Sequence, residues 1–282
     1  MPQALALIAG LLALSPALAP RATLPMTVSG GLVPIDTPTV RLDLAGLKAR
    51  LAKDSSGTPD LSNVDLGGLD LTGFDFKKAN LTGAGLANAK MAGANLFACD
   101  LTDAVLTGAD LTRANLDGTV LRRAHLQKAN LQGASLFATI IEAADLSGAN
   151  LSEARIIGYL RAANLTGVTA RNAKAGADPG NQSMGVMRAT FVGANLSGAD
   201  FSGANLFKAD FSHANLSGAK FAGADLSNSE LVETDLTKAD VTGAKFAKAN
   251  LDGADFRGAT GVPQMQGVDE ARNKDKAHFD AK

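Results

Sequence analysis

The chain has 282 residues, of which 46% are hydrophobic and 5% aromatic, with one Tyr, no Trp and one Cys. This composition is typical of a narrow repetitive fold, because a globular core uses more aromatic residues. The formal net charge of −1 favours neither a nucleic acid nor a membrane surface as a partner. A single cysteine also excludes a disulfide within one chain.

Residues 1–19 are predicted to be an export signal peptide. The apolar run from residue 4 to residue 14 is too short to span a bilayer, and small residues follow it. Cleavage is expected after Ala17 or after Ala19, and Pro20 favours the first site. We therefore expect an exported protein of the periplasm or an equivalent lumenal compartment. A chain poor in thiols suits such an oxidising compartment.

A linker and a short helix are predicted to precede the repeats. Residues 20–40 contain four prolines and a Gly-Gly pair, which is typical of a linker. Residues 41–57 include Asp43 as an N-cap candidate, with Leu44, Leu47 and Leu51 on one helical face. Terminal units of repeat proteins are usually atypical, so we expect this helix to cap the first coil; the alternative is a free surface helix.

A five-residue period dominates residues 58–165 and 189–260. A large apolar residue falls on every fifth position, a small residue, usually Ala, lies two places before it, and Asn or Asp usually lies between. A helix would rotate this series by about 500° per unit, and a continuous strand would alternate its faces. The pattern instead predicts a short extended piece followed by a turn, which winds the chain into a filled solenoid.

The turn falls on the two residues after each large apolar residue. Gly often takes the second of them, where a type II turn requires a positive φ. Within residues 189–260 other residues replace it at six corners, for which we expect a different turn type: Lys208, His213, Asn228, Glu233, Lys238 and Lys248. The outward Asn or Asp is suited to bonding the backbone of the turn. Thr119 and Thr139 replace inward Ala, so their hydroxyls must find backbone partners.

The unit Ala-(Asn/Asp)-(Leu/Phe)-x-Gly resembles the pentapeptide-repeat family, whose consensus is A(D/N)LXX. The resemblance implies an all-β fold, a right-handed quadrilateral parallel β-helix with four pentapeptides per coil. It covers residues 58–165 and 189–260. Stacks should then repeat every twenty residues, which places Leu66, Leu86, Leu106, Leu126 and Leu146 above one another.

Two features depart from the regular repeat and supply candidate partner contacts. The pattern shifts by one residue after Ile156, and residues 166–188 are predicted to form an inserted loop, either functional or disordered. Phe97 and Phe137 are expected to be exposed on one face, two coils or about 10 Å apart, unless they lie against a turn or loop. The candidate contacts are therefore Phe97, Phe137, Arg171, Lys174, Asp178, Asn181 and Met184.

Residues 261–282 are polar and charged, with Val268, Ala271 and Phe279 as candidate anchors. We expect this segment to cap the last coil. A homodimer contact through this C-terminal end and a disordered tail are the alternatives.

The sequence offers no pattern of residues that supports chemistry. Three His lie far apart, no spacing matches a metal site, and no nucleophile elbow, phosphate loop or dinucleotide fingerprint occurs. Cys99 takes an inward Ala position, where a buried and inert thiol is expected. A filled solenoid also lacks the concave pocket of most enzymes. We expect no enzyme activity, cofactor, metal or small-molecule substrate.

The sequence therefore predicts an exported, non-enzymatic scaffold that binds an unidentified protein through the solenoid faces and the 166–188 loop. The family resemblance adds an alternative, since some members mimic duplex DNA and bind DNA gyrase, conferring quinolone resistance. The near-neutral charge and the export signal argue against that role. A purely structural envelope protein is the third alternative.

Overall fold

The computed structural model describes residues 40–177 and 187–281, which all belong to one compact unit spanning residues 38–282. The predicted signal peptide and nearly all of the predicted linker lie outside the described residues. The same holds for three candidate contacts, Asp178, Asn181 and Met184.

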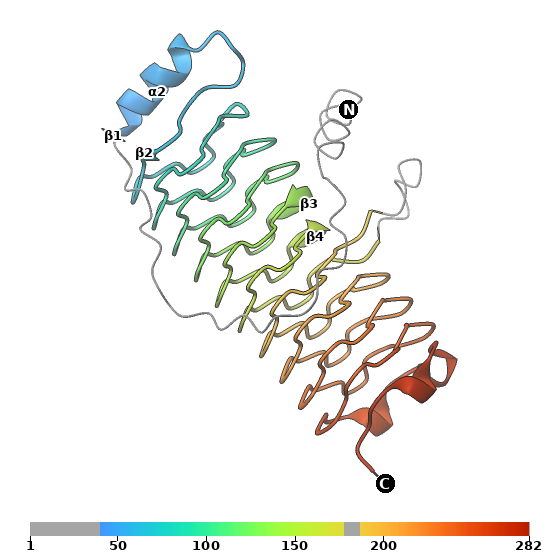
Figure 1. The fold of residues 1–282 in the computed structure, drawn as a ribbon. Helices are drawn as coiled ribbons and strands as arrows, with labels where there is room; N and C mark the ends of the chain where they lie inside the picture. The colour runs from blue at the N-terminus through green and yellow to red at the C-terminus, as the bar shows by residue number, and fades with distance from the viewer. Residues whose placement is uncertain (1–39, 178–186, 282) are drawn as a thin grey trace, which may run out of the picture. The chain divides into compact units, whose positions relative to one another are not determined.

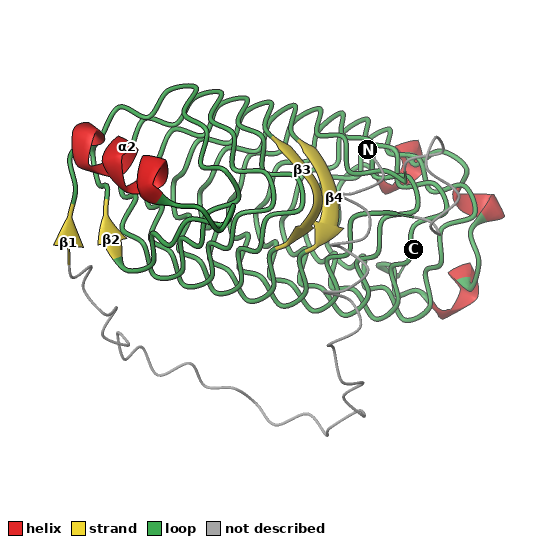
Figure 2. Cartoon of the chain, turned by 90° about the horizontal axis from the view of Figure 1, so that it is seen from above, coloured by secondary structure: helices red, strands yellow, loops and turns green. Residues whose placement is uncertain are grey.

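The repeats form a solenoid with four pentapeptides per coil (Figures 1 and 2). Parallel bridges join outward residues twenty positions apart, such as Asp65 to Gly85, Val105 to His125 and His125 to Asp145. The amide of each large inward residue of the regular coils also donates to the next coil, as from Leu106 to the carbonyl of His125. The predicted stacking of Leu66, Leu86, Leu106, Leu126 and Leu146 is confirmed by this register.

The inward residues fill the coils as one continuous hydrophobic cluster. Apart from Phe76, leucine dominates the large core residues of the first half, and phenylalanine becomes frequent after residue 190, where Phe191 stacks on Phe211 with ring centroids 4.8 Å apart. One coil is thinner, because Ala170 and Ala175 hold positions that Leu or Phe holds elsewhere. Ala170 lies directly over Phe201 in the register, so a larger side chain in the next coil fills this space.

The regular corners share a left-handed residue at the second turn position, whether or not it is glycine, so the prediction of a different turn type at the six named corners is wrong. Gly198 and Gly218 have φ of 66° and 65°, and Lys208 and His213 have φ of 61° and 60°. The turn hydrogen bond is also retained, as from the Ala209 amide to the Leu206 carbonyl at 2.9 Å. Stacking between coils therefore holds these residues in the left-handed region at a cost of about 1 kcal/mol each.

Outward Asn and Asp side chains support the turns as predicted. The carboxylate of Asp110 accepts from the Thr112 amide at 3.1 Å, and the same bond recurs at most outward Asn or Asp residues. The predicted backbone partners of the inward threonines are also present. Thr119 Oγ1 donates to the Leu96 carbonyl at 2.9 Å, and Thr139 Oγ1 donates to the Leu116 carbonyl at 3.0 Å.

The first coil lies beside helix α2 (Leu44–Lys53). Asp43 caps the helix by accepting from the Gly46 amide at 2.7 Å, and Leu47 and Leu51 are buried in the solenoid core. Ahead of the helix, β1 (Val40–Arg41) pairs in parallel with β2 (Val64–Asp65). The predicted linker therefore ends one residue early, because Val40 already extends the stack.

The last coil has a longer step than the repeats. Its bridging residues Thr260, Gln266, Arg272 and His278 lie six positions apart. The extra residues form the 3-10 helices η2 (Val262–Gln264), η3 (Val268–Glu270) and η4 (Lys274–Lys276). The candidate anchors Val268, Ala271 and Phe279 pack against the core, and the Phe279 ring stacks on Phe256 at 5.0 Å.

Candidate functional site

One corner of the solenoid contains both departures from the five-residue step within residues 60–260. We call it the irregular corner; its described residues are 136–140, 156–159, 175–177 and 187–190. Successive outward residues around it are four positions apart from Arg155 to Tyr159 and sixteen apart from Lys174 to Thr190. The interruption thus begins near residue 178, so the prediction of a loop from residue 166 is wrong. Residues 166–177 continue the repeat with buried Val168, Ala170, Ala173 and Ala175.

The four-residue step straightens the chain at this corner. Strand β3 (Ser135–Ile140) pairs with β4 (Arg155–Tyr159), and Ala138 bulges out where β4 has no counterpart. Gly158 takes the place of an inward small residue. A Cβ there would lie 2.4 Å from the carbonyl oxygen of Thr139, so only glycine fits. On β4 the corner turns without the left-handed residue found at the regular corners, whereas on β3 Ala138 keeps it, with φ of 56°.

An apolar surface patch lies along this corner. Val120, Ile140 and Tyr159 occupy successive outward positions of a single column, linked by parallel bridges. The same column carries Asp, Asn, Thr, Glu or Arg at all its other described positions. Phe137 and Ile157 flank the column at the bend. We call these five residues the central patch. Ile157 is 4% exposed and Val120 8%, while the other three are half-buried.

Cations border the central patch on both sides. Arg122 and Arg161 lie two positions after Val120 and Tyr159, and Arg155 and Lys174 occupy neighbouring outward positions before the bend. We call these four residues the basic rim. Arg122 pairs with Glu142 at 3.1 Å, and the Arg155 guanidinium lies 4.2 Å from the Phe137 ring centroid. Arg161 and Lys174 are exposed, and neither has an ion-pair partner in the part of the chain that the structure describes.

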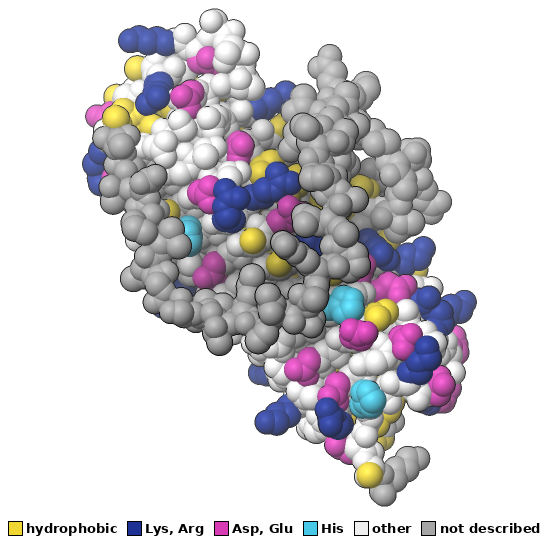
Figure 3. Space-filling view, in the orientation of Figure 1, with side chains coloured by type: hydrophobic (Ala, Val, Ile, Leu, Met, Phe, Trp, Pro, Cys, Tyr) yellow, Lys and Arg dark blue, Asp and Glu magenta, His cyan; other side chains and the backbone are white. Residues whose placement is uncertain are grey.

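Basic residues are concentrated in these middle coils. The described residues between 113 and 190 contain nine Lys or Arg and four Asp or Glu. Residues 40–112 contain seven Lys or Arg and nine Asp or Glu. Residues 191–281 contain nine Lys or Arg and thirteen Asp or Glu. Figure 3 shows basic and hydrophobic side chains gathered over the middle coils. The chain is therefore near neutral overall but carries a positive band flanked by acidic ends.

The two predicted aromatic contacts are less exposed than expected. Phe97 and Phe137 are both half-buried, because cationic side chains cover their rings. Lys78 Nζ lies 5.8 Å from the Phe97 ring centroid, and Arg155 covers Phe137. They do share one column of corner positions, as expected, but only Phe137 belongs to the central patch.

The two described basic candidates separate onto different faces. Lys174 belongs to the basic rim, next to Arg155 in the register. Arg171 lies on the preceding corner and pairs with Asp200 at 2.8 Å, so it joins two coils rather than the central patch. Hydrogen bonds from Ser202 and Arg171 outweigh the desolvation of the Asp200 carboxyl and hold its pKa below the ordinary value.

Sequence reasoning missed Val120, Ile140, Tyr159 and Ile157. A signal for three of them is present in the sequence, since each places an apolar residue where the repeat calls for Asn or Asp. Their coming together depends on the twenty-residue register and on the one-residue shift at Gly158. Without the register, Val120 and Tyr159 are merely two irregular units.

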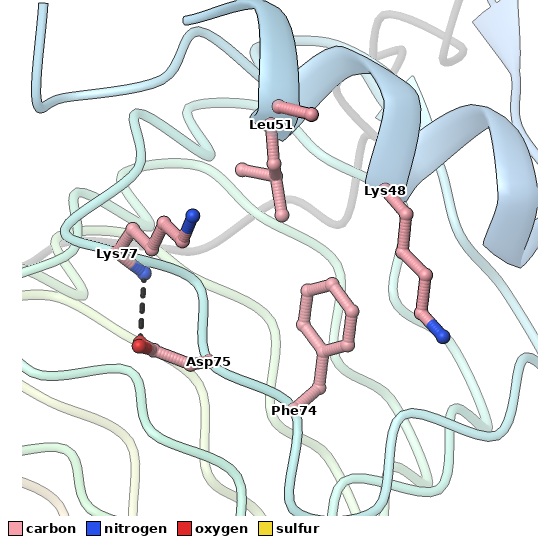
Figure 4. A pocket seen from close by; sticks show the side chains of 6 residues that line it. Lys48, Leu51, Phe74, Asp75 and Lys77 are labelled. Carbon is pink, nitrogen blue, oxygen red and sulfur yellow. Dashed lines mark hydrogen bonds between the residues drawn. The ribbon is translucent and has the colours of Figure 1, made fainter.

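A hollow lies between helix α2 and the first coil. It has a volume of about 260 Å³ and is lined by Lys48, Leu51, Ala52, Phe74, Asp75 and Lys77 (Figure 4). The Asp75 carboxylate accepts from the Lys77 amide at 3.0 Å and from the Asn95 side chain at 3.0 Å.

The structure places no metal-binding group in its described residues, where no three His, Cys, Asp or Glu side chains converge. Cys99 is buried, and burial raises the pKa of its thiol to about 12. None of the helices in residues 40–177 and 187–281 has the length and hydrophobicity needed to cross a bilayer.

The family model for pentapeptide repeats matches eight copies, over residues 60–96, 99–136, 187–223 and 219–258. These ranges cover just over half of the chain. The chain belongs to the pentapeptide-repeat family. Family members are generally structural or binding modules, and this pentapeptide-repeat protein presents its irregular corner in the segment between the two matched halves.

Solved structures of other pentapeptide-repeat proteins are similar to this one. HetL, a protein involved in heterocyst differentiation regulation in the cyanobacterium Nostoc sp. strain PCC 7120, is 28% identical with a TM-score of 0.40. That match covers 84% of this chain and 94% of HetL. QnrB1, a plasmid-mediated fluoroquinolone resistance protein, is 15% identical with a TM-score of 0.36, over 77% of this chain and 86% of its own. No curated protein sequence matches the chain.

Proposed function

We propose that this pentapeptide-repeat protein is a non-enzymatic scaffold that binds a partner protein through the central patch and the basic rim. The observation that carries the proposal is the run of three outward apolar residues, Val120, Ile140 and Tyr159, in a column that is otherwise polar. Contiguous apolar surface bordered by charge is typical of protein-binding sites. The half-buried aromatic rings supply the kind of anchor that dominates such interfaces.

The alternative of a DNA mimic that binds gyrase fits the charge distribution poorly. A mimic of duplex DNA needs a continuous negative surface, whereas the middle coils carry nine basic and four acidic residues. The alternative of a purely structural envelope protein explains the solenoid but gives no reason for an apolar column at the irregular corner.

Three finer features belong to the same proposal. The coils are taken to be right-handed, as in the family. Helix α2 is taken to be a lid on the first coil, supported by the burial of Leu47 and Leu51. Export is taken to follow from residues 1–19, and fractionation with N-terminal sequencing of the mature protein tests it: mature protein beginning at Leu18 or Pro20 is expected, and an intact Met1 in the cytosol contradicts it.

Quantitative affinity purification from the cells that make the protein tests the binding role. The variant Val120→Asn, Ile140→Asn, Tyr159→Asn restores polar residues to the column and should lose the specific partner. Val105→Asn is the matched control, because Val105 is an outward apolar residue of a different column. Equal recovery of the same proteins by all three forms contradicts the proposal, provided that thermal unfolding shows each variant to be folded.

A further inference from the structure

We infer that the segment held by the central patch is an acidic peptide segment with large apolar side chains, lying along the solenoid axis. This inference rests on the proposed function and names the chemistry of its partner. It follows from the form of the apolar surface, from the charges around it and from the polar groups that this surface lacks.

The apolar surface runs along the axis of the solenoid. Val120, Ile140 and Tyr159 come from three successive coils, so neighbours are separated by one coil spacing of about 4.8 Å. The column becomes polar on both sides, at Asp100 and at Thr190 followed by Asp210. The apolar strip is thus a few residues long and one column wide, with Phe137 and Ile157 at one side. This shape suits the apolar side of one peptide segment better than a broad domain surface.

The charged residues beside the apolar strip indicate the sign of the charge on the bound peptide segment. Arg122 and Arg161 lie on one side, and Arg155 and Lys174 lie on the other. The acidic groups nearest in the register are Glu142, which pairs with Arg122, and Asp117, which accepts from the Phe137 amide at 2.9 Å. Both acids are therefore engaged within the solenoid. Arg161 and Lys174 have exposed side chains to offer an incoming carboxylate, which favours an acidic segment.

A nucleic acid would also be attracted by the basic rim, but an acidic peptide fits this surface better. The centre of the site is aliphatic, and Val120, Ile140 and Ile157 offer no hydrogen-bonding side chain to a phosphate or a base edge. Single-stranded nucleic acid needs exposed aromatic faces for stacking. Phe137 does not provide one, because Arg155 covers its ring.

Selection from a random 12-residue peptide phage library on the purified full chain tests the inference. Recovered peptides should be enriched in Asp and Glu together with Leu, Ile, Phe, Tyr or Trp. Their affinity, measured by fluorescence anisotropy with synthetic peptide, should fall about ten-fold or more in Arg161→Glu, Lys174→Glu. Higher salt should weaken binding by wild-type protein, since exposed charges are screened. Lys220→Glu, Lys245→Glu is the control for charge reversal outside the basic rim and should leave the affinity unchanged.

The outcomes separate this inference from the proposed function. Neutral or basic peptides that bind wild-type protein and are lost in Val120→Asn, Ile140→Asn, Tyr159→Asn overturn the acidic chemistry but keep the binding role. Failure to recover peptides, or affinities that ignore the charge reversal, also overturns the inference. A 12-nucleotide single-stranded RNA that binds through Arg161 and Lys174 in place of peptides overturns it as well. The binding role itself fails only if affinity purification also shows no difference among the variants.

Discussion

Three of the four inward hydroxyl groups of the described core have a backbone partner. Thr119, Thr139 and Thr234 each donate to a carbonyl of the preceding coil. Ser229 occupies the same kind of inward position, but its Oγ has no hydrogen-bond partner among the described residues. A buried hydroxyl without a partner costs about 1–3 kcal/mol.

Ser229→Ala should therefore raise the free energy of unfolding by about 1 kcal/mol, because Ala is the residue that the position holds in most units. Denaturant unfolding followed by circular dichroism measures the change. Thr234→Ala is the comparison: its hydroxyl is hydrogen-bonded to the Phe211 carbonyl at 2.9 Å, so its loss should destabilise the protein. Destabilisation by Ser229→Ala contradicts the account.

The buried thiol gives a second prediction at the residue scale. Burial raises the pKa of Cys99 to about 12, so almost no thiolate exists at pH 8. Ellman's reagent should leave the folded protein unlabelled at pH 8 and should react with one thiol per chain in denaturant. Rapid labelling of the folded protein would mean that the coil around Cys99 opens readily.

Acid should weaken the contact between Arg171 and Asp200. The pKa of Asp200 is lower in the folded protein, so its stabilisation is present above the unfolded value of about 3.9 and is lost as pH falls through the folded value. The free energy of unfolding should therefore decrease more between pH 6 and pH 3 in the wild type than in Asp200→Asn. The expected difference is a few tenths to about 1 kcal/mol, because the Arg171 side chain is largely exposed. An equal decrease in both proteins contradicts this contribution.

At the scale of the element, the corner is the unit on which the solenoid depends. Regular corners require a positive φ, and several leave open space around it; a Cβ at Gly218, for example, would meet nothing within 4 Å. The irregular corner is the reverse case. At Gly158 a Cβ would strike the Thr139 carbonyl oxygen of the neighbouring coil.

Two alanine substitutions separate these requirements. Gly218→Ala should cost about 1 kcal/mol, the conformational cost of a left-handed Ala. Gly158→Ala should cost more, about 2–4 kcal/mol, because β3 and β4 must move apart. Thermal and denaturant unfolding of both variants provide the measurement. Equal costs would show that the two coils at the irregular corner are not tightly packed.

Much of this fold could be predicted from the sequence, because the period gives the inward direction and the family resemblance implies four pentapeptides per coil, and so the register. The alternation of Ala and Leu identified the inward side, and the twenty-residue coil then fixed which leucines stack. The conformation at Lys208 and Glu233 could not be predicted, because local preference opposes a positive φ there and only stacking against neighbouring coils imposes it.

The candidate site was predicted only in part. Phe137 and Lys174 were identified as candidate contacts. That Arg155 covers the Phe137 ring and lies next to Lys174 depends on the register across the irregular corner. The continuation of the repeat through residues 166–177 was missed because Ala170 and Ala175 replace the large apolar residue by which a unit is found. The register restores them, since their neighbours bridge to the coils on both sides.

At the scale of the whole molecule, a filled solenoid binds with its outer surface. The described coils have acidic ends and a positive middle, and the apolar column lies within that positive middle. Both departures in repeat length within residues 60–260 fall at the same corner. The regular coils can then be understood as the support that holds the central patch and the basic rim in fixed positions.

Hydroxyl-radical footprinting of the protein with and without its purified partner tests this claim most directly, because it reports side-chain exposure residue by residue. The partner should reduce the labelling of Tyr159, Ile140 and Phe137, and should leave Phe207 and Phe279 unchanged. Protection confined to the terminal coils, or no protection at Tyr159 and Ile140 in a verified complex, would contradict the account.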